Sequence, residues 1–213
     1  METTTNTSNT ITPDTRPHFA AACETLRAVV GGVQPGELDR PTPCTDMTVR
    51  ELVDHVGMAL GRVTAAGRRR PLDEWPTEGF SVGEDIVAGI DGLVAEAVAA
   101  WDDERLGEQV ELPWTVLPGN EALATYVNEV LVHSWDLATA TGQDPAYDDE
   151  AVAVADALMH DQLPVPERAA MWEMFAEHMP EGIPFVAPFD DAVPVADDAP
   201  AIVRLVAWNG RRP

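Results

Sequence analysis

Apolar side chains recur at helical spacing in four long segments of the chain. Within each segment they lie three or four residues apart, which places them in one stripe along one side of a helix. The segments cover residues 16–30, 48–67, 82–101 and 120–141. No long alternating run of the kind typical of β-strands interrupts them. Four amphipathic helices of this length predict an all-α fold built on a four-helix bundle.

Turn and capping residues predict where these helices begin and end. Gly31–Gly32 follows the first stripe and Gly142 follows the fourth, and glycine at such positions commonly ends a helix. Thr48 is followed three residues later by Glu51, which is the pattern of a capping box. The second helix is therefore expected to begin at Thr48.

The remaining sequence flanks the bundle on both sides. Residues 1–16 are rich in Thr, Asn and Ser and are expected to form a disordered tail. We assign residues 17–145 to the bundle, and residues 146–213 to an additional helix and a Pro-rich C-terminal extension packed on the bundle. Helical segments are predicted within this last part at 148–163, 166–179 and 200–208.

The charge of the chain narrows the choice of partners. It has 13 basic residues, all of them arginine, against 37 acidic residues, for a formal net charge of −24. A nucleic-acid partner needs clustered cations, so this composition argues against nucleic-acid binding. Arginine without lysine is what a GC-rich genome encodes, and life at high salt is the rival explanation of the acidity.

Signals for secretion or membrane insertion are missing from the sequence. Two cysteines are too few for a disulfide framework. No stretch approaches the roughly 18 apolar residues of a membrane span, and the polar N-terminus has no basic and apolar regions of a signal peptide. A cytoplasmic location without a membrane partner is therefore expected.

Three side chains on two of the predicted helices could share one divalent cation. Glu129 and His133 lie four residues apart, which puts a carboxylate and an imidazole one turn apart on the same helix face. Alone, such a pair is more typical of a solvated helix surface than of metal ligands. His55 lies at the edge of the apolar stripe of the second helix, where a boundary position without function is the alternative. If these helices face each other, the three side chains form a two-histidine, one-carboxylate set that leaves coordination positions open.

Two longer motifs surround these residues. The first is PTPC at residues 41–44 leading into VRELVDHVG at 49–57, and the second is NEVLVHSWDLATATG at 128–142. Both resemble motifs of the mycothiol-dependent maleylpyruvate isomerase N-terminal family, which belongs to the DinB/YfiT-like group of metal-binding four-helix bundles. The segment 194–200 with Arg204-Leu205 is similar to an actinobacterial branch described as metal-binding proteins. The resemblance covers residues 17–213.

This resemblance implies that His55, Glu129 and His133 are the three ligands of a divalent metal. Zinc is the first choice, and nickel or iron suit the same ligands. The resemblance also implies mycothiol as a thiol cosubstrate and a small electrophile as substrate. Many bundles of this group dimerise, so a homodimer is an open expectation. Asp136 lies one turn beyond His133 and could accept its second N–H, with a plain surface carboxylate as the alternative.

The sequence also departs from the family pattern. Met47 stands where the family usually has tryptophan, which we expect to be a tolerated exchange of bulky apolar groups. The isomerase carries a further C-terminal domain with substrate contacts, and the residues after this bundle do not obviously match it. The resemblance therefore supports metal binding by this chain better than it supports isomerase activity.

Several other cysteine, tryptophan and histidine residues are expected to have structural or surface positions without a role in the chemistry. Cys44 is expected to be a buried structural thiol rather than a nucleophile, because no histidine is near it in the sequence. Core packing is expected for Trp101 and Trp114. The other histidines are expected to be ordinary surface or boundary residues; they are His18, which could line the bundle end, His160 and His178.

Three functions from different classes follow from these observations. The first is a metal- and mycothiol-dependent transferase or isomerase. The second is a non-enzymatic module that binds metal for stability, storage or sensing. The third is a small-molecule or partner-binding protein in which the ligand set is vestigial, and the intact set of three ligands speaks against it.

Overall fold

The computed structural model describes residues 14–44, 46–177 and 187–213. Residues 1–13 of the expected disordered tail lie outside the described residues, and so does His178. At the junction with the tail, Thr15 is buried and its hydroxyl donates to the backbone carbonyl of Asn120 at 3.1 Å. The first helix begins at Arg16, where the first helical segment was predicted to start.

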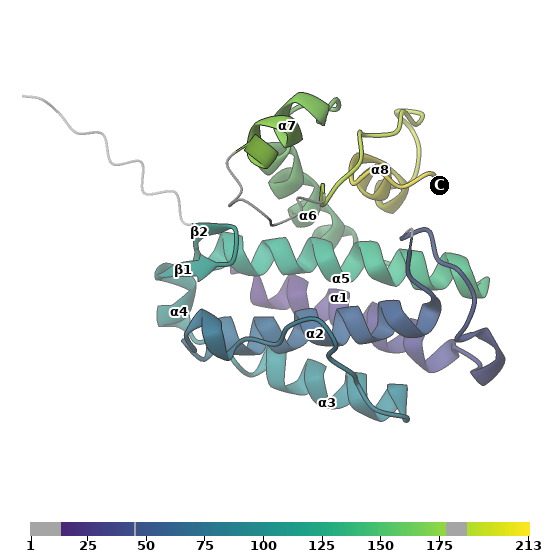
Figure 1. Ribbon diagram of the computed structural model, residues 1–213, viewed down its shortest axis with the longest axis horizontal. Coiled ribbons are helices and arrows are strands. Elements are labelled where there is room, and N and C mark those ends of the chain that lie inside the picture. Colours follow the sequence, from purple (N-terminus) through teal and green to yellow (C-terminus); the bar gives the residue numbers. More distant parts are fainter. Residues whose placement is uncertain (1–13, 45, 178–186) are drawn as a thin grey trace, which may run out of the picture.

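Four long helices form a bundle: α1 (Arg16–Gly32), α2 (Val49–Gly67), α3 (Ile86–Val98) and α5 (Gly119–Thr141). Helix α1 packs against α5 and α3, and α2 packs against α3 and α5, so each of the four helices has two neighbours within the bundle (Figure 1). Their apolar stripes meet in one core that includes Phe19, Leu26, Leu52, Leu60, Ile90 and Leu131. The predicted all-α bundle is confirmed.

Local capping signals in the sequence set two of the helix ends as predicted. The Thr48 hydroxyl accepts from the backbone N–H of Glu51 at 3.3 Å, and the Glu51 carboxylate accepts from the backbone N–H of Thr48 at 2.8 Å. This reciprocal capping box starts α2. Gly142 follows α5 with a φ of 69°, the left-handed conformation that ends helices.

The end of α1 was predicted incorrectly. Gly31 and Gly32 are the last two residues of the helix rather than its stop. A Cβ on Gly32 would collide with the side chain of Gln143. This amide donates from Nε2 to the carbonyl of Val29 at 3.0 Å and so satisfies a group near the helix end. Gly32 therefore provides room for a residue far along the chain.

The start of α3 also differs from its predicted position near residue 82. The helix begins at Ile86, and the carboxylate of Asp85 caps its first turn. The backbone N–H of Val82 donates to the Asp54 carboxylate on α2 at 2.8 Å, and Gly83 has a φ of 94°. These contacts hold the preceding chain against α2 and prevent it from continuing the helix.

A short connection between α3 and α5 was not predicted. It contains α4 (Asp103–Gly107) and an antiparallel hairpin of β1 (Gln109–Leu112) and β2 (Thr115–Pro118). Four-residue strands are too short for a clear alternating pattern. Trp114 lies in the hairpin turn and is 55% exposed, so its predicted core position was wrong. Trp101 is buried, as expected.

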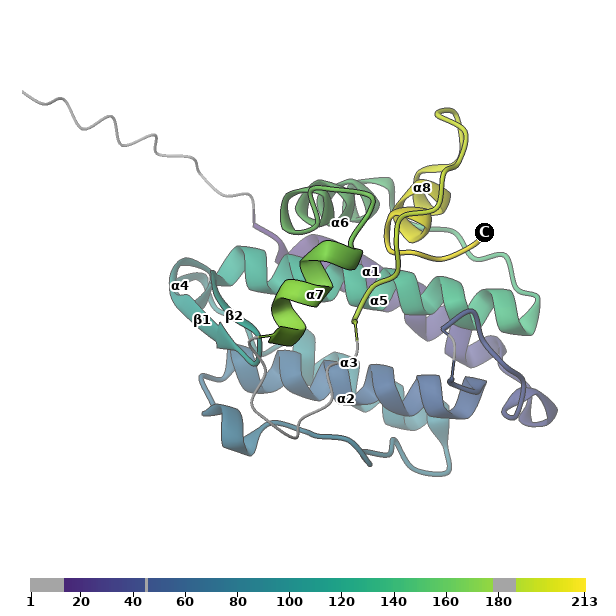
Figure 2. The ribbon, with the colours of Figure 1, turned by 45° about the horizontal axis from the view of Figure 1, so that its top comes forward.

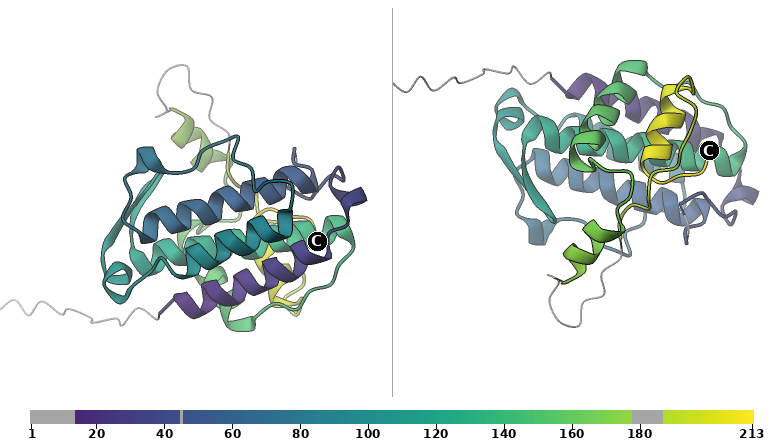
Figure 3. Two further views of the ribbon diagram at one scale, coloured as in Figure 1. Left: turned by 90° about the horizontal axis from the view of Figure 1, so that it is seen from below. Right: turned by 90° about the horizontal axis from the view of Figure 1, so that it is seen from above.

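In its described residues the C-terminal part adds three helices: α6 (Asp149–Gln162), α7 (Ala169–Glu177) and α8 (Ala201–Trp208). Helix α6 packs on α5 and α1, and α8 packs on α6 and α5. Both cover the same side of α5, away from α2 and α3 (Figure 2 and Figure 3). None of the described helices combines the length and apolar character needed to cross a membrane.

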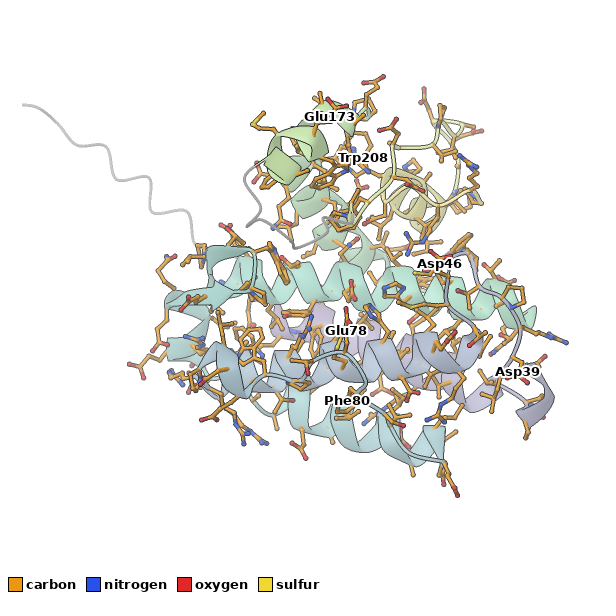
Figure 4. The ribbon with its side chains drawn as sticks, viewed as in Figure 1. Asp39, Asp46, Glu78, Phe80, Glu173 and Trp208 are labelled. Carbon is orange, nitrogen blue, oxygen red and sulfur yellow. The ribbon has the colours of Figure 1, made fainter. Side chains whose placement is uncertain are left out.

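A buried arginine holds the extension together. Arg168 is 0% exposed, and its guanidinium donates to the backbone carbonyls of Asp190 and Trp208 at 2.6 Å each. Trp208, labelled in Figure 4, also stacks on His160 of α6 with ring centroids 3.9 Å apart. The parts of the extension are thus joined to one another by specific polar contacts and by ring stacking.

Candidate metal centre

The fold brings His55 of α2 next to Glu129 and His133 of α5. Nε2 of His55 lies 2.9 Å from Oε1 of Glu129, and Nε2 of His133 lies 3.4 Å from the same oxygen. The imidazole centroids are 5.0 Å apart with their planes at 83°. One ligand atom from each of the three residues lies within 4.8 Å of the others. Two adjacent helices thus point two nitrogens and one oxygen at a common volume.

This arrangement fits a small divalent cation. Metal–ligand bonds of about 2.0–2.1 Å at tetrahedral angles place ligand atoms about 3.4 Å apart. The separation between His133 and Glu129 has this value, and that between His55 and Glu129 is somewhat shorter, as expected for a direct hydrogen bond. Two imidazoles and a carboxylate are the donor set that zinc, nickel and iron accept.

The three side chains are not equally buried. His133 is 8% exposed, whereas His55 and Glu129 are 27% and 29% exposed. The centre is therefore closed on the His133 side and reachable from solvent on the side of the other two. An open side is what distinguishes a site that admits a small molecule from a closed structural metal site.

Asp136 lies on the closed side of the centre. Its side chain is 0% exposed, and Oδ2 lies 3.0 Å from Nδ1 of His133. A carboxylate at this position orients the imidazole and leaves Nε2 directed at Glu129. The alternative that Asp136 is a helix-surface carboxylate does not agree with its burial.

Arg211, near the C-terminal end of the chain, pairs with the same carboxylate. Its guanidinium donates from Nε and Nη2 to both oxygens of Asp136 at 2.9–3.2 Å. Sequence reasoning missed this residue, because 75 positions separate the two partners. No local motif could have indicated the pair.

The titration of the centre follows from these contacts. Burial alone would raise the pKa of the Glu129 carboxyl, but the charge of His133 and the hydrogen bonds of His133 and His55 outweigh it and hold this pKa well below its usual range. Burial opposes the charge on His133, yet Glu129 and Asp136 raise its pKa to about 9. At neutral pH the metal-free His133 therefore carries both ring protons, one toward each carboxylate.

Cys44 comes closer to this chemistry than the sequence suggested. Its Sγ, a nitrogen of His133 and a carboxylate oxygen of Asp136 lie within 4.8 Å of one another. The thiol is half-buried, and this burial raises its pKa. It is thus a protonated thiol behind His133 and a poor nucleophile. The loop that carries it passes beside α5, as Asp46 marks in Figure 4.

Tyr126 is a further residue that sequence reasoning missed. It lies one turn before Glu129 on α5, and its side chain is buried at 3% exposure. Its hydroxyl has no hydrogen-bond partner among the described residues. Burial and the charge of Glu129 raise the pKa of this phenol. Tyr126 therefore carries a neutral, buried hydroxyl on the turn of α5 before Glu129.

The remaining histidines do not join the centre. His18 is half-buried in the first turn of α1, and His160 is exposed on α6. Neither belongs to a group of potential metal ligands within the described residues.

Comparisons with known proteins agree with the family resemblance of the two motifs. The family described as the mycothiol maleylpyruvate isomerase N-terminal domain matches residues 19–138, more than half of the chain. Two uncharacterized proteins of Mycobacterium tuberculosis, Rv0738 of strain ATCC 25618 / H37Rv and MT0763 of strain CDC 1551 / Oshkosh, are each 28% identical over 202 residues, or 89% of this chain and 93% of their own length. No solved structure gives a significant match.

Proposed function

This chain belongs to the mycothiol maleylpyruvate isomerase N-terminal domain family, and we propose that it binds a divalent metal and uses it in a thiol-dependent transfer or isomerisation of a small electrophile. The metal is zinc, held by His55, Glu129 and His133. The thiol is mycothiol, as the name of the family suggests.

The observation that carries this proposal is the convergence of three ligand atoms from two helices. Oε1 of Glu129 lies between Nε2 of His55 and Nε2 of His133, at 2.9 and 3.4 Å. A chance pair of residues on one helix would not explain the third residue, which comes from α2. The buried Asp136 adds the orienting acceptor that metal-binding histidines commonly have.

The residues of such a centre have different positions and roles. His133 and Asp136 form its rigid, buried side, while His55 and Glu129 border its open side. A bound divalent metal would lower the pKa of a coordinating thiol to near neutrality. The open side leaves room for that thiol and for the electrophile.

The proposal also includes the domain organisation, the cellular location and the partners of the protein. The bundle at 17–145 carries the ligands, with 146–213 packed on it, and we place the protein in the cytoplasm, with small-molecule partners. The net charge of −24 supports partners other than nucleic acid.

Metal analysis of purified protein tests the ligand assignment. Zinc loaded into the wild type should be stoichiometric, and Glu129→Ala and His55→Ala should lose it. His160→Ala is the matched control, because it removes an exposed histidine outside the centre. Full stoichiometric metal in Glu129→Ala would show that the assignment is wrong.

Turnover then separates the enzyme from a module that only binds metal. Zinc-loaded wild type is incubated with mycothiol and a maleylpyruvate-type electrophile, and product is followed by absorbance. Thiol-dependent turnover that disappears in His55→Ala supports the enzyme. Tight zinc binding without turnover on a panel of small electrophiles favours the non-enzymatic module.

A further inference from the structure

We propose that Arg211 is a positioning residue of the metal centre, which acts through Asp136 to hold His133 in its metal-binding orientation. The C-terminal segment thereby completes a site whose ligands all lie in the bundle. This inference rests on the proposed metal binding. It goes beyond the family match, which ends at residue 138.

The contact between Arg211 and Asp136 is a bidentate pair. Nε donates to Oδ1 at 3.0 Å and to Oδ2 at 3.2 Å, while Nη2 donates to Oδ2 at 2.9 Å. The Asp136 side chain is 0% exposed and that of Arg211 is 15% exposed, so the pair is largely shielded from water. Arginine can form this fork and lysine cannot, because only the guanidinium offers parallel N–H donors.

The same carboxylate oxygen connects the pair to the metal centre. Oδ2 of Asp136 takes the two guanidinium contacts and also lies 3.0 Å from Nδ1 of His133. A carboxylate clamped from one side cannot rotate freely, so its acceptor direction toward His133 is set. His133 then presents Nε2 to the volume that it shares with Glu129 and His55.

The backbone around Arg211 is built to place this side chain. At the end of α8 the N–H of Gly210 donates to the Ala207 carbonyl at 3.0 Å, and the N–H of Arg211 donates to the Val206 carbonyl at 2.9 Å. Gly210 has a φ of 86°, which completes a Schellman motif. The turn directs the chain after α8 back toward α5, where Asp136 lies.

A buried amide pair anchors this turn on the bundle. Asn209, at the end of α8, exchanges two side-chain hydrogen bonds of 3.0 Å with Asn128 of α5. Both residues are buried. Arg211 is therefore held by the folded structure rather than by an exposed end of the chain, whereas its neighbour Arg212 is exposed.

Zinc affinity of full-length variants tests the inference, with a chromophoric chelator as competitor. Arg211→Met should weaken zinc binding by about tenfold or more, the usual effect of removing a group that orients a metal ligand. Arg212→Met is the matched control and should stay within about twofold of the wild type, because it removes an adjacent exposed arginine. The absorption spectrum of bound Co²⁺ should also change in Arg211→Met, which a role in stability alone would not cause.

Two further variants show whether the effect passes through Asp136. In an Asp136→Asn background, Arg211→Met should add less than about a twofold loss, because the connection is already broken. Arg211→Lys keeps the charge without the fork and should give an intermediate affinity. If Arg211→Met does not fold, Arg211→Lys decides the question by the same two measurements.

The outcomes separate the two proposals. Wild-type affinity and an unchanged Co²⁺ spectrum in folded Arg211→Met, or in Arg211→Lys where the former does not fold, overturn the positioning role and leave the metal site intact. An equal loss of affinity in both backgrounds shows that Arg211 does not act through Asp136 and also overturns it. Failure of the wild type to bind zinc overturns the proposed function itself.

Discussion

The amide pair between Asn128 and Asn209 makes a sharp prediction about how the C-terminal segment is held. Each side chain donates one hydrogen bond to the other at 3.0 Å, and Asn209 donates a further one to the carbonyl of Leu205 at 2.8 Å. Asn128→Ala removes both reciprocal bonds. It leaves Oδ1 of Asn209 buried without a partner, while the bond to Leu205 remains.

The expected cost follows from these groups. An orphaned buried acceptor costs about 1–3 kcal/mol, and a lost intramolecular hydrogen bond about 1 kcal/mol more. We therefore expect Asn128→Ala to lower the free energy of unfolding by about 2–4 kcal/mol. Removing both amides leaves no orphaned group, so Asn128→Ala/Asn209→Ala should cost less than the sum of the single changes, with a coupling of about 1–2 kcal/mol.

Urea unfolding followed by circular dichroism measures these values. Thr139→Ala is the control, because it truncates an exposed side chain on the same helix and should change stability by less than about 0.5 kcal/mol. A loss below about 0.5 kcal/mol in Asn128→Ala, or strictly additive single changes, would refute the reasoning.

Four further predictions concern the centre and the start of α2. The pKa of His133 is raised from 6.5 to about 9, so the folded metal-free protein holds a proton that the unfolded chain releases between these values. Its contribution to metal-free stability is complete below pH 6.5 and is lost as the pH rises to about 9, which urea unfolding at several pH values will show. Since zinc must displace this proton, the zinc affinity measured in competition titrations should rise about tenfold per pH unit over the same range. An affinity that does not change with pH would contradict the assignment of His133 as a ligand. Tyr126→Phe should leave the free energy of unfolding and the zinc affinity at their wild-type values, because its hydroxyl has no partner in the described part of the chain. A clear drop in either quantity would reveal a hidden contact. Thr48→Ala should lower the free energy of unfolding by about 1 kcal/mol through loss of the capping box, and no change in urea midpoint would disprove that role.

Much of the fold could be predicted from the sequence, because the residues that determine its helices and helix ends are close together in the chain. The stripes of α2 and α5, the Thr48–Glu51 capping box and the left-handed Gly142 each involve residues within a few positions of one another. The boundaries that were wrong depend on distant contacts. Gly32 ends up beside Gln143, and the residues before α3 are held by Asp54.

Some residues of the candidate site were likewise predicted from the sequence, and others were found only in the structure. His55, Glu129 and His133 were named from spacing and from two motifs, and Asp136 was named as a candidate acceptor. The contact between His55 and Glu129 spans 74 residues, so only the packing of α2 against α5 shows how close they are. The sequence carried no signal for the neighbourhood of Cys44, for the burial of the Tyr126 hydroxyl or for the fork of Arg211.

The sequence by itself determined which segments are helical and which residue types could bind a metal, because periodicity, capping and donor chemistry act over a few residues. Spacing and motifs singled out Glu129 among the 37 acids, but only the tertiary structure showed that it lies beside both histidines and which of the 13 arginines reaches behind them. Hydrogen bonds and ion pairs are short-range, whereas the chain between Asp136 and Arg211 can take many paths. Packing of α8 on α5 selects one of them and thereby closes the rear of the site.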